Sequence, residues 1–474
     1  MKSIINKICT SEVTRHVLYI YAASFVLLCL LIANPGYFSH DELQRFDFYV
    51  QHGLASYFRA MLNLNPGTSF ATPMRPFAFF IQGLQNLFMH DYPVVVHLSS
   101  ALVTATIAVL VYAVATVFGL ARSTGLLAAF IFILSPLSVQ ATGWSAALMD
   151  QWFVLWGLLC LLAVKVFLEQ QRWPFITPVL ISAFCLLALL SKETAIIWPG
   201  AMLIFVIKDF KQLGNRRLWM AAAAWALPVL VYLGYRLLAI KASLATDASS
   251  PYSIGLHNVL QNMFVYFAFP FVPKLGELQT WVNVPDTILA ASLLLHVFVI
   301  AALARLTSLR LAGLYVYGYF LFLLPVLLIP NMSSHYLFGS ALVLAVALAY
   351  IVCNGGSWLY RIPGWLCIML LAMHSLNFQQ ELYQDGTCMA RLAASSESLL
   401  LSNGRPQHIQ YRFELNSPAH VLLRYTNDRN QIGLNYPVRM TVLLDSNTPP
   451  DLSALQAYMN KECIAVQQQT ASVR

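Results

Sequence analysis

Long segments without a single charged side chain dominate this sequence. Segments 98–120 and 311–329 contain no Asp, Glu, Lys or Arg. A bilayer crossing needs about 20 apolar residues, so each of these segments is long enough to span a membrane. Only 10% of the 474 residues are charged, whereas soluble domains carry roughly 25%. The sequence therefore predicts an α-helical polytopic membrane protein.

Apolar runs of this kind predict about 11 transmembrane helices. The first run, 17–33, follows Lys2, Lys7 and Arg15 and does not end in a signal-peptide cleavage pattern. We therefore expect an uncleaved first span that starts in the cytoplasm, which leaves the C-terminal segment outside after eleven crossings. The other runs lie near 94–118, 125–142, 146–168, 175–190, 194–207, 218–240, 286–304, 311–329, 335–353 and 363–378.

The distribution of Lys and Arg agrees with this topology, because cytoplasmic loops are enriched in both. Segment 257–273 leaves one alternative open. It is apolar but interrupted by Pro270 and Pro273, so it is either re-entrant or a further span, and a further span moves the C-terminal domain inside. The cations of the connections expected inside are Arg122, Lys165, Arg172, Lys208, Lys211, Arg216, Arg217, Arg305, Arg310 and Arg361.

The first outer loop, 34–93, contains adjacent carboxylates, Asp41 and Glu42, directly after His40. Ionisable groups at membrane depth are costly and usually mark a substrate path or a reacting centre. Loops of this length are uncommon without a function, although a wet loop or a lid without chemistry is the alternative. Apolar pieces at 54–58 and 77–87 indicate amphipathic helices at the membrane surface.

Three further sites place cations, or a group able to become one, on the same outer face. Arg75 ends the polar part of the first loop, Lys192-Glu193 follows the fifth run, and His335-Tyr336 joins the ninth and tenth. Taken singly, such residues commonly snorkel at span ends. Together with the acidic pair they favour a site for an anionic lipid and for an acceptor that loses a proton.

Beyond residue 378 the composition becomes polar, which divides the chain into a membrane domain, 1–378, and a small soluble α/β domain, 379–474. Residues 408–415 and 438–444 are predicted as strands, and 451–459 as a helix. Cys388 and Cys463 are the two cysteines of the soluble domain. In an oxidising compartment they are expected to form a disulfide, with two unrelated free thiols as the alternative.

Several short motifs resemble those of GT-C-type glycosyltransferases, and more closely the O-mannosyltransferase-like branch with its tetratricopeptide-linked transmembrane enzymes. The departures from that pattern are Ser135, Gln140 and Ser334-His335, which replace a His, a Glu and a Glu-Arg, and no tetratricopeptide repeat follows. The motifs that carry the resemblance are the acidic pair, Met74-Arg75-Pro76, His97 at the opening of the second span, residues 135–144 (resembling His-Pro-x-x-x-Glu-x-x-x-Trp), residues 190–195 (Leu-Ser-Lys-Glu-Thr-Ala), and residues 324–325 with 335–337.

The resemblance implies transfer of a sugar, with inversion, from a polyprenyl-phosphate donor to an acceptor hydroxyl. The reaction is expected on the outer face of a bacterial inner membrane, with the C-terminal domain periplasmic. The catalytic candidates are Asp41 and Glu42: Asp41 is expected to act as the base, and Glu42 to orient a neighbour or the acceptor. The donor phosphate is assigned to Arg75, Lys192 and His335. The remaining candidates for the substrate groove are His40, His97, Glu193 and Tyr336.

The expected acceptor is lipopolysaccharide, O-antigen, or another surface glycan or lipid, and protein O-glycosylation is the alternative. Other classes remain open. A secondary transporter or polyprenyl-linked-glycan flippase would show repeated halves, and an O-antigen ligase or polymerase would typically carry basic residues in a late outer loop.

No cofactor is assigned. The acidic pair is compatible with a divalent metal, but further carbonyl or carboxylate ligands are not identifiable, so no metal site is predicted. The sequence also lacks a Gly-rich phosphate loop and Cys or His clusters with zinc spacing. The net charge of +8 is attributed to cytoplasmic loops that face anionic lipid, so no nucleic-acid partner is expected.

Overall fold

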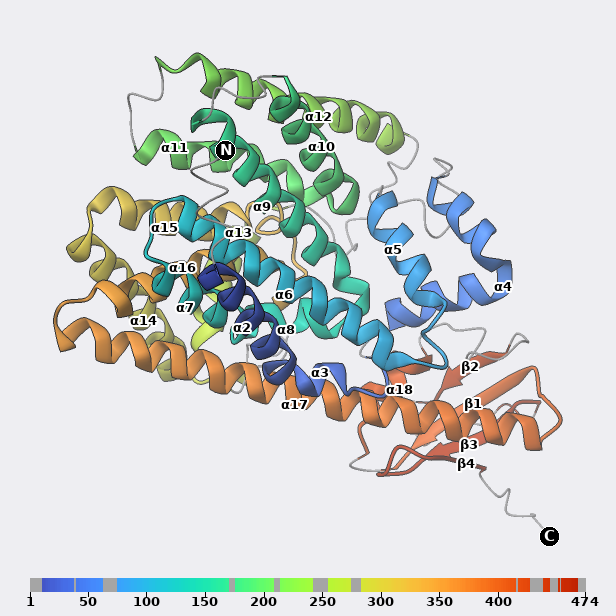
Figure 1. Ribbon diagram of the computed structural model, residues 1–474. Coiled ribbons are helices and arrows are strands. Elements are labelled where there is room, and N and C mark those ends of the chain that lie inside the picture. The colour runs from blue at the N-terminus through green and yellow to red at the C-terminus, as the bar shows by residue number, and fades with distance from the viewer. Residues whose placement is uncertain are drawn as a thin grey trace, which may run out of the picture.

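The computed structural model shows a helical body and a small sheet unit, joined by the last long helix, α17 (Trp358–Ser402) (Figure 1). This confirms the predicted class of a polytopic helical protein with a small C-terminal α/β unit. The structure describes residues 11–37, 40–62, 75–169, 175–208, 214–241, 255–273, 283–414, 417–426, 438–443, 451 and 453–467.

Six helical segments of the described residues are long and apolar enough to cross a membrane. A bent pair of helices makes a seventh if it is counted as one span, and the number eleven stays a prediction. The six segments are α6 (Pro93–Val117), η1 (Ser145–Ala147) with α9 (Leu148–Glu169), the part Arg216–Gly234 of α12 (Arg216–Lys241), α14 (Asp286–Leu306), η6 (Ser334–Leu337) with α16 (Phe338–Asn354), and α17. Shorter helices of the body are α2 (Ser11–Leu27), α3 (Cys29–Ile32), α10 (Ile176–Ser191), η2 (Glu193–Met202) and α11 (Leu203–Lys208).

The bent pair consists of α7 (Arg122–Ile133) and α8 (Pro136–Gly143), whose axes differ by 57°. Pro136 lacks an N–H and cannot continue the hydrogen bonding of α7, but it suits the first turn of a new helix. The Ser135 side chain caps this turn by accepting from the backbone N–H of Leu137 at 3.3 Å. The motif 135–144 therefore opens a separate helix that is entirely buried.

The predicted apolar run 311–329 is not one continuous helix, and segment 257–273 contains only a short one. The run 311–329 is helical only in α15 (Leu309–Leu321). The Asn262 side chain donates to the carbonyls of Leu327 and Ile329, at 2.9 and 2.8 Å, and so satisfies non-helical backbone inside the body. Asn262 belongs to α13 (Asn258–Ala268), which η4 (Phe269–Phe271) follows. Eleven residues of α13 measure about 16 Å, too short to cross the roughly 30 Å hydrocarbon core alone.

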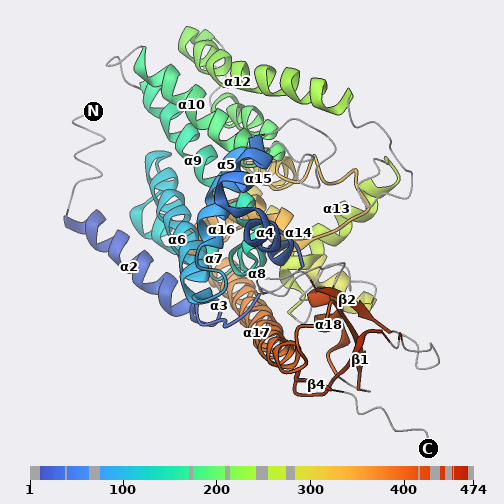
Figure 2. The same cartoon turned by 90° about the vertical axis from the view of Figure 1, so that its right-hand side faces the viewer.

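The first outer loop contains two helices, α4 (His40–Leu62) and α5 (Pro76–Asn86), where the sequence predicts amphipathic segments. Gly53, with a φ of 72°, interrupts α4, and this backbone region favours glycine. In both views α4 lies beside the sheet unit (Figure 2), and Leu43 of α4 packs against the core of that unit. The first loop is therefore held between the helical body and the sheet unit.

Helix α17 runs continuously through the predicted boundary at residue 378, and no linker separates the two units there. Its C-terminal part contributes Met389, Leu392 and Leu400 to the core of the sheet unit. Where α17 passes the start of the first loop, the Asn34 side chain donates to the carbonyl of Leu382 at 3.1 Å. A Cβ on Gly386 would lie 1.9 Å from the Oδ1 atom of Asn34, so glycine is required at this approach.

The sheet unit has four strands in the order β2-β1-β3-β4, with two parallel pairs and one antiparallel pair. Strands β1 (His408–Phe413) and β2 (Arg439–Val442) lie where the sequence predicts strands. The predicted helix at 451–459 is wrong, because this segment contains strand β3 (Leu455–Met459). The other elements are α18 (Ala419–Thr426) and β4 (Ala465–Gln467).

The local chemistry of Asp451 explains this misassignment. The Asp451 carboxylate accepts from the backbone N–H and the hydroxyl of Ser453, at 2.9 and 2.6 Å. This Asx turn uses the same contacts as a helix N-cap, so the two are alike at the level of sequence. Ala457 and Met459 then alternate into the core as in a strand.

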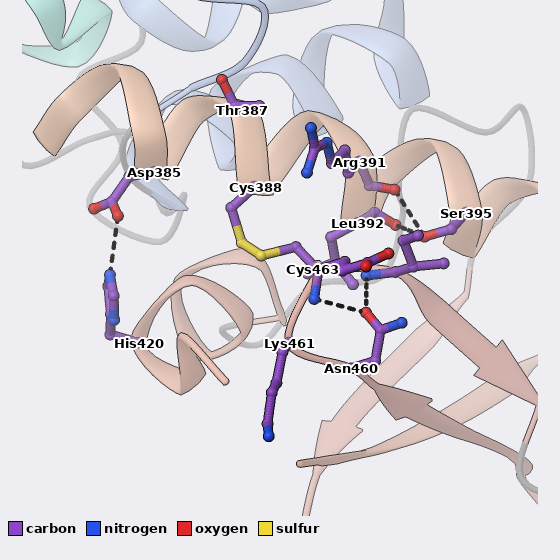
Figure 3. The surroundings of a disulfide bond; sticks show 12 residues. Asp385, Thr387, Cys388, Arg391, Leu392, Ser395, His420, Asn460, Lys461 and Cys463 are labelled. Atoms are coloured by element: carbon purple, nitrogen blue, oxygen red, sulfur yellow. Dashed lines mark hydrogen bonds and ion pairs between the residues drawn. A yellow bond between two sulfur atoms is a disulfide. The ribbon is translucent and has the colours of Figure 1, made fainter. Parts of the chain in front are cut away.

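Cys388 and Cys463 form a disulfide that joins α17 to the turn before β4 (Figure 3). Their Cα atoms lie 5.2 Å apart, and the cysteines are separated by 75 residues in the sequence. Because the bond closes this long loop, it restricts the unfolded chain. The disulfide therefore fixes the sheet unit against α17.

We expect Cys388→Ser to destabilise the sheet unit by about 2–5 kcal/mol, as is typical for the loss of a native disulfide. A non-reducing peptide map of freshly prepared protein should recover residues 388 and 463 in one linked peptide. Hydrogen exchange of β1 and β3 measures the stability of the sheet unit and should become faster in Cys388→Ser. Cys353→Ser, which removes a free thiol of α16, is the matched control and should leave this exchange unchanged. Recovery of both Cys388 and Cys463 as free thiols would reject the bond.

Candidate functional site

Arg75 and Glu193 form a two-point ion pair between the first outer loop and the start of η2. The Nε atom of Arg75 donates to one carboxylate oxygen at 2.6 Å, and Nη2 donates to the other. Burial opposes the charge of Arg75, but the Glu193 carboxylate outweighs it and raises the pKa of the guanidinium. Arg236 of α12 lies 3.8 Å from Glu193. Glu193 therefore connects the first loop with α12.

Lys192, the residue before Glu193, turns into the protein and pairs with Asp150. Its Nζ atom donates to Oδ1 of Asp150, and the two side chains are only 3% and 2% exposed. Lys192 has extended backbone dihedral angles between α10 and η2. This backbone lets two adjacent residues face different partners. Lys192 also lies over the Tyr336 ring, 4.8 Å from its centroid.

Asp150 is a site residue that the sequence analysis missed. It lies in the first turn of α9, inside the run 146–168, which the sequence predicts as a membrane span. The preceding residue, Met149, contacts Nη1 of Arg75 through its sulfur at 2.6 Å. A lone carboxylate near the start of an apolar run was the available signal, because such groups are costly without a partner.

His335 lies beside this cluster and is held by α8. Its Nε2 atom is 4.0 Å from Oδ2 of Asp150, and its ring contacts Trp144 edge-on at 5.0 Å between centroids. Its backbone N–H donates to the side-chain carbonyl of Gln140 at 2.9 Å. The motifs at 135–144 and 335–337 are thus in direct contact.

The acidic pair reaches the cluster through the short η1 turn. Glu42 is fully buried and accepts from the backbone N–H of Ser145 at 2.5 Å. Arg45, one turn along α4, donates to the carbonyl of Ala146 at 3.5 Å. Burial lowers the pKa of the Arg45 guanidinium, and the Asp41 carboxylate opposes this shift. Segment 144–150 therefore touches the acidic pair at one end and the Lys192 pair at the other.

Of the other groove candidates, Tyr336 lies in the cluster, His97 lies at the start of the first loop, and the side chain of His40 is outside the described residues. His97 is buried, and its Nε2 atom is 2.8 Å from the carbonyl oxygen of Gly36, so it supports the start of the first loop. His40 opens α4, but its side chain lies outside the described residues, as do Ser39 and Met74. Tyr336 joins the cluster through its ring, 4.2 Å from that of His335.

The donor set of this cluster does not match a metal site. Among the described residues, no group of three or more His, Cys, Asp or Glu side chains is arranged to hold an ion. Glu42 is engaged by a backbone N–H and Asp150 by an ammonium. Divalent cations bind to several oxygen ligands, which these two engaged carboxylates do not provide. The cluster consists of carboxylates paired with cations, Asp150 with Lys192 and Glu193 with Arg75.

No protein-family model matches the sequence, and no curated protein matches it either. The chain is similar to an Archaeoglobus fulgidus oligosaccharyltransferase tethered with an acceptor peptide, at 12% identity and a TM-score of 0.48, covering 90% of this chain and 63% of that one. It is similar to ArnT from Cupriavidus metallidurans bound to undecaprenyl phosphate, at 14% identity and a TM-score of 0.47, covering 92% and 87%.

A third similar structure is the S. cerevisiae protein O-mannosyltransferase Pmt1-Pmt2 complex bound to the sugar donor, at 14% identity and a TM-score of 0.36, covering 55% and 37%. The chain spans less than two thirds of the length of the archaeal enzyme, 62–63%. At such identities and TM-scores, the likeness assigns neither a family nor an activity.

We expect Asp150→Asn to lower the free energy of unfolding by about 3–5 kcal/mol, because it leaves the Lys192 ammonium buried without a counter-charge. The matched control is Glu169→Gln on the same helix, whose pair with Lys165 is partly exposed and worth about 0.5 kcal/mol or less. Thermal unfolding in detergent compares the two variants. The double substitution Lys192→Met with Asp150→Leu should recover most of the loss. Equal melting temperatures for Asp150→Asn and Glu169→Gln would contradict the pairing.

Proposed function

We propose that this chain is a membrane glycosyltransferase that moves a sugar from a polyprenyl-phosphate donor to an acceptor hydroxyl. The observation that carries the proposal is the contact of the acidic-pair loop with a buried group of cations through segment 144–150. Carboxylates suit proton abstraction, and fixed cations in a dry site suit a departing phosphate. The proposed acceptor is a surface glycan or lipid such as lipopolysaccharide or O-antigen.

Asp41 is the proposed base. Its carboxylate takes the proton of the acceptor hydroxyl while that oxygen bonds to the anomeric carbon from the side opposite the phosphate. The bond between the anomeric carbon and the phosphate oxygen breaks, and the phosphate leaves with the electron pair. A single displacement of this kind inverts the configuration. Glu42, held by the Ser145 N–H, fixes the first turn of α4 and with it Asp41.

Lys192 and Arg75 are the proposed phosphate ligands, and their pairing leaves donors for this task. An ammonium has three N–H donors and a guanidinium has five. Lys192 donates one to Asp150, while Arg75 donates two to Glu193 and one to Met149. Counting partners among the described residues, each keeps two N–H groups for a phosphate without breaking its ion pair. The pairs hold both cations in place before the donor arrives, so little reorganisation is needed.

The proposed location is a bacterial inner membrane with the sheet unit in the periplasm. The Cys388–Cys463 disulfide supports this placement, because disulfides persist in oxidising compartments. The resemblance of the motifs to O-mannosyltransferases keeps protein O-glycosylation as the second candidate. Mass spectrometry of surface glycans and of secreted proteins, with and without the gene, distinguishes the two acceptors.

Asp41→Asn should reduce transfer by about 10²–10⁴-fold, the range typical of general-base help. The substitution keeps the shape of the side chain and removes the proton acceptor, so membrane insertion should be normal. The change in glycan mass, measured in cells that carry the variant gene, reports transfer. Glu42→Gln, tested beside it, should act through protein stability instead. Wild-type turnover in Asp41→Asn would overturn the assignment of the base.

Lys192→Ala should weaken binding of undecaprenyl phosphate by about tenfold or more, since a charge-assisted hydrogen bond is typically worth 1.5–3 kcal/mol. Lys192→Arg should retain part of the affinity, because both cations bind phosphate with different geometries. Lys165→Ala, at the other end of α9, is the matched control. Binding is measured in detergent at fixed ionic strength. Equal affinity in wild type and Lys192→Ala would remove Lys192 from the site.

A further inference from the structure

The side-chain carbonyl of Gln140 organises the segment around His335. It accepts the backbone N–H of His335 at 2.9 Å, and it also accepts the hydroxyls of Ser334 and, at 3.1 Å, Ser333. A backbone N–H can only donate, so this contact fixes which end of the Gln140 amide faces the segment. The Gln140 atom that meets Ser333 is therefore an acceptor.

Ser333 then determines the tautomer of His335. A hydroxyl has one proton to donate, and Ser333 donates it to Gln140. The Oγ atom of Ser333 also lies 2.6 Å from Nδ1 of His335. If the hydroxyl donated to Nδ1 instead, Oγ and the Gln140 oxygen would meet at 3.1 Å as two acceptors. The arrangement in which Nδ1 donates in this second bond is therefore favoured. A neutral imidazole with its proton on Nδ1 presents a lone pair at Nε2.

The Nε2 atom of His335 faces a second acceptor. Oδ2 of Asp150 lies 4.0 Å away, too far for a direct hydrogen bond. Within the described part of the chain, Oδ2 has no hydrogen-bond partner, while Lys192 donates to Oδ1. Two acceptors that face one another are unfavourable without a donor between them. A sugar hydroxyl, or a water molecule in its place, can donate at this position.

A charged imidazolium is the alternative, and the surrounding charges disfavour it. Asp150 already pairs with Lys192, and Glu193 already faces both Arg75 and Arg236. A further cation would have no carboxylate of its own in a buried cluster, which is costly. The group beside the proposed phosphate site is therefore better described as an acceptor than as a third cation.

We propose that His335 binds a hydroxyl of the transferred sugar through Nε2, and that Gln140 and Ser333 are positioning residues that fix this tautomer. The inference rests on the proposed function, because the sugar is covalently attached to the phosphate that Lys192 and Arg75 hold. His335 and Oδ2 of Asp150 then select a sugar with hydrogen-bond donors at this position. A sugar lacking them leaves buried acceptors unpaired and is rejected.

The tautomer is tested without any substrate. Protein labelled with ¹⁵N-histidine is examined in detergent by long-range ¹H–¹⁵N spectroscopy near pH 7, and the His335 signals are found among those of the 11 histidines by subtracting the spectrum of His335→Gln. We expect a neutral ring protonated on Nδ1, which becomes a mixture of tautomers in Ser333→Ala. A ring protonated on Nε2, or an imidazolium, overturns the inference.

The sugar contact is tested with variants that separate an acceptor from a cation. Gln can present a carbonyl oxygen near the position of Nε2, whereas Lys and Arg present only donors and charge. In cells lacking the gene, we expect His335→Gln to restore glycan modification to within about tenfold of wild type. His335→Lys and His335→Arg should lose roughly 10–100-fold, the usual effect of leaving a buried polar group unpaired. The exposed His90→Gln should be silent.

Binding of undecaprenyl phosphate, which carries no sugar, distinguishes the proposed phosphate site from the proposed sugar contact of His335. We expect its affinity to fall in Lys192→Ala and to be unchanged in His335→Gln. An affinity lost in His335→Gln and retained in His335→Lys would make His335 a phosphate ligand and overturn the inference. If the wild-type gene restores no glycan change and the wild-type protein binds no undecaprenyl phosphate, the proposed function fails and the sugar role fails with it. The ¹H–¹⁵N spectrum then tests only the tautomer of His335.

Discussion

The pairing of buried charge is the interaction on which this site depends. Lys192 and Asp150 are both almost completely buried, and neither charge could remain there without the other. The pair joins the end of α10 to the first turn of α9, and the Arg75–Glu193 pair joins the first loop to η2. Four elements thus meet where membrane segments end. The same contacts that stabilise the body also hold cations ready for an anionic ligand.

The helical class, the long first loop and the C-terminal unit could all be predicted from the sequence, because hydropathy and Lys/Arg bias act over tens of residues. Some local details could not. Pro325 indicates a break in the run 311–329, but not that Asn262, distant in the sequence, satisfies the non-helical carbonyls that follow it. The turn at Asp451 uses the contacts of an N-cap before a strand. In both places a contact that is invisible to periodicity supports the structure.

For the site, the sequence indicated Arg75, Lys192, Glu193 and His335, and the structure brings them together. Asp150 was missed because one carboxylate barely changes the hydropathy of a 22-residue helix. The function of Gln140 was also invisible, since its three donors come from residues almost two hundred positions later. Single polar residues inside apolar segments, such as Asp150 and Gln140, therefore pair with residues that are distant in the sequence.

The length of α17 has a consequence for how the sheet unit is carried. Its 45 residues measure about 68 Å at 1.5 Å per residue, against roughly 40–45 Å for a whole bilayer. Helix α17 is therefore longer than a bilayer is thick, and its C-terminal part continues without a break into the core of the sheet unit. A single residue inserted into α17 before Cys388 would rotate everything after it by about 100° and turn the sheet unit away from α4. The height and the direction of the sheet unit are thus set by the residue count of one helix.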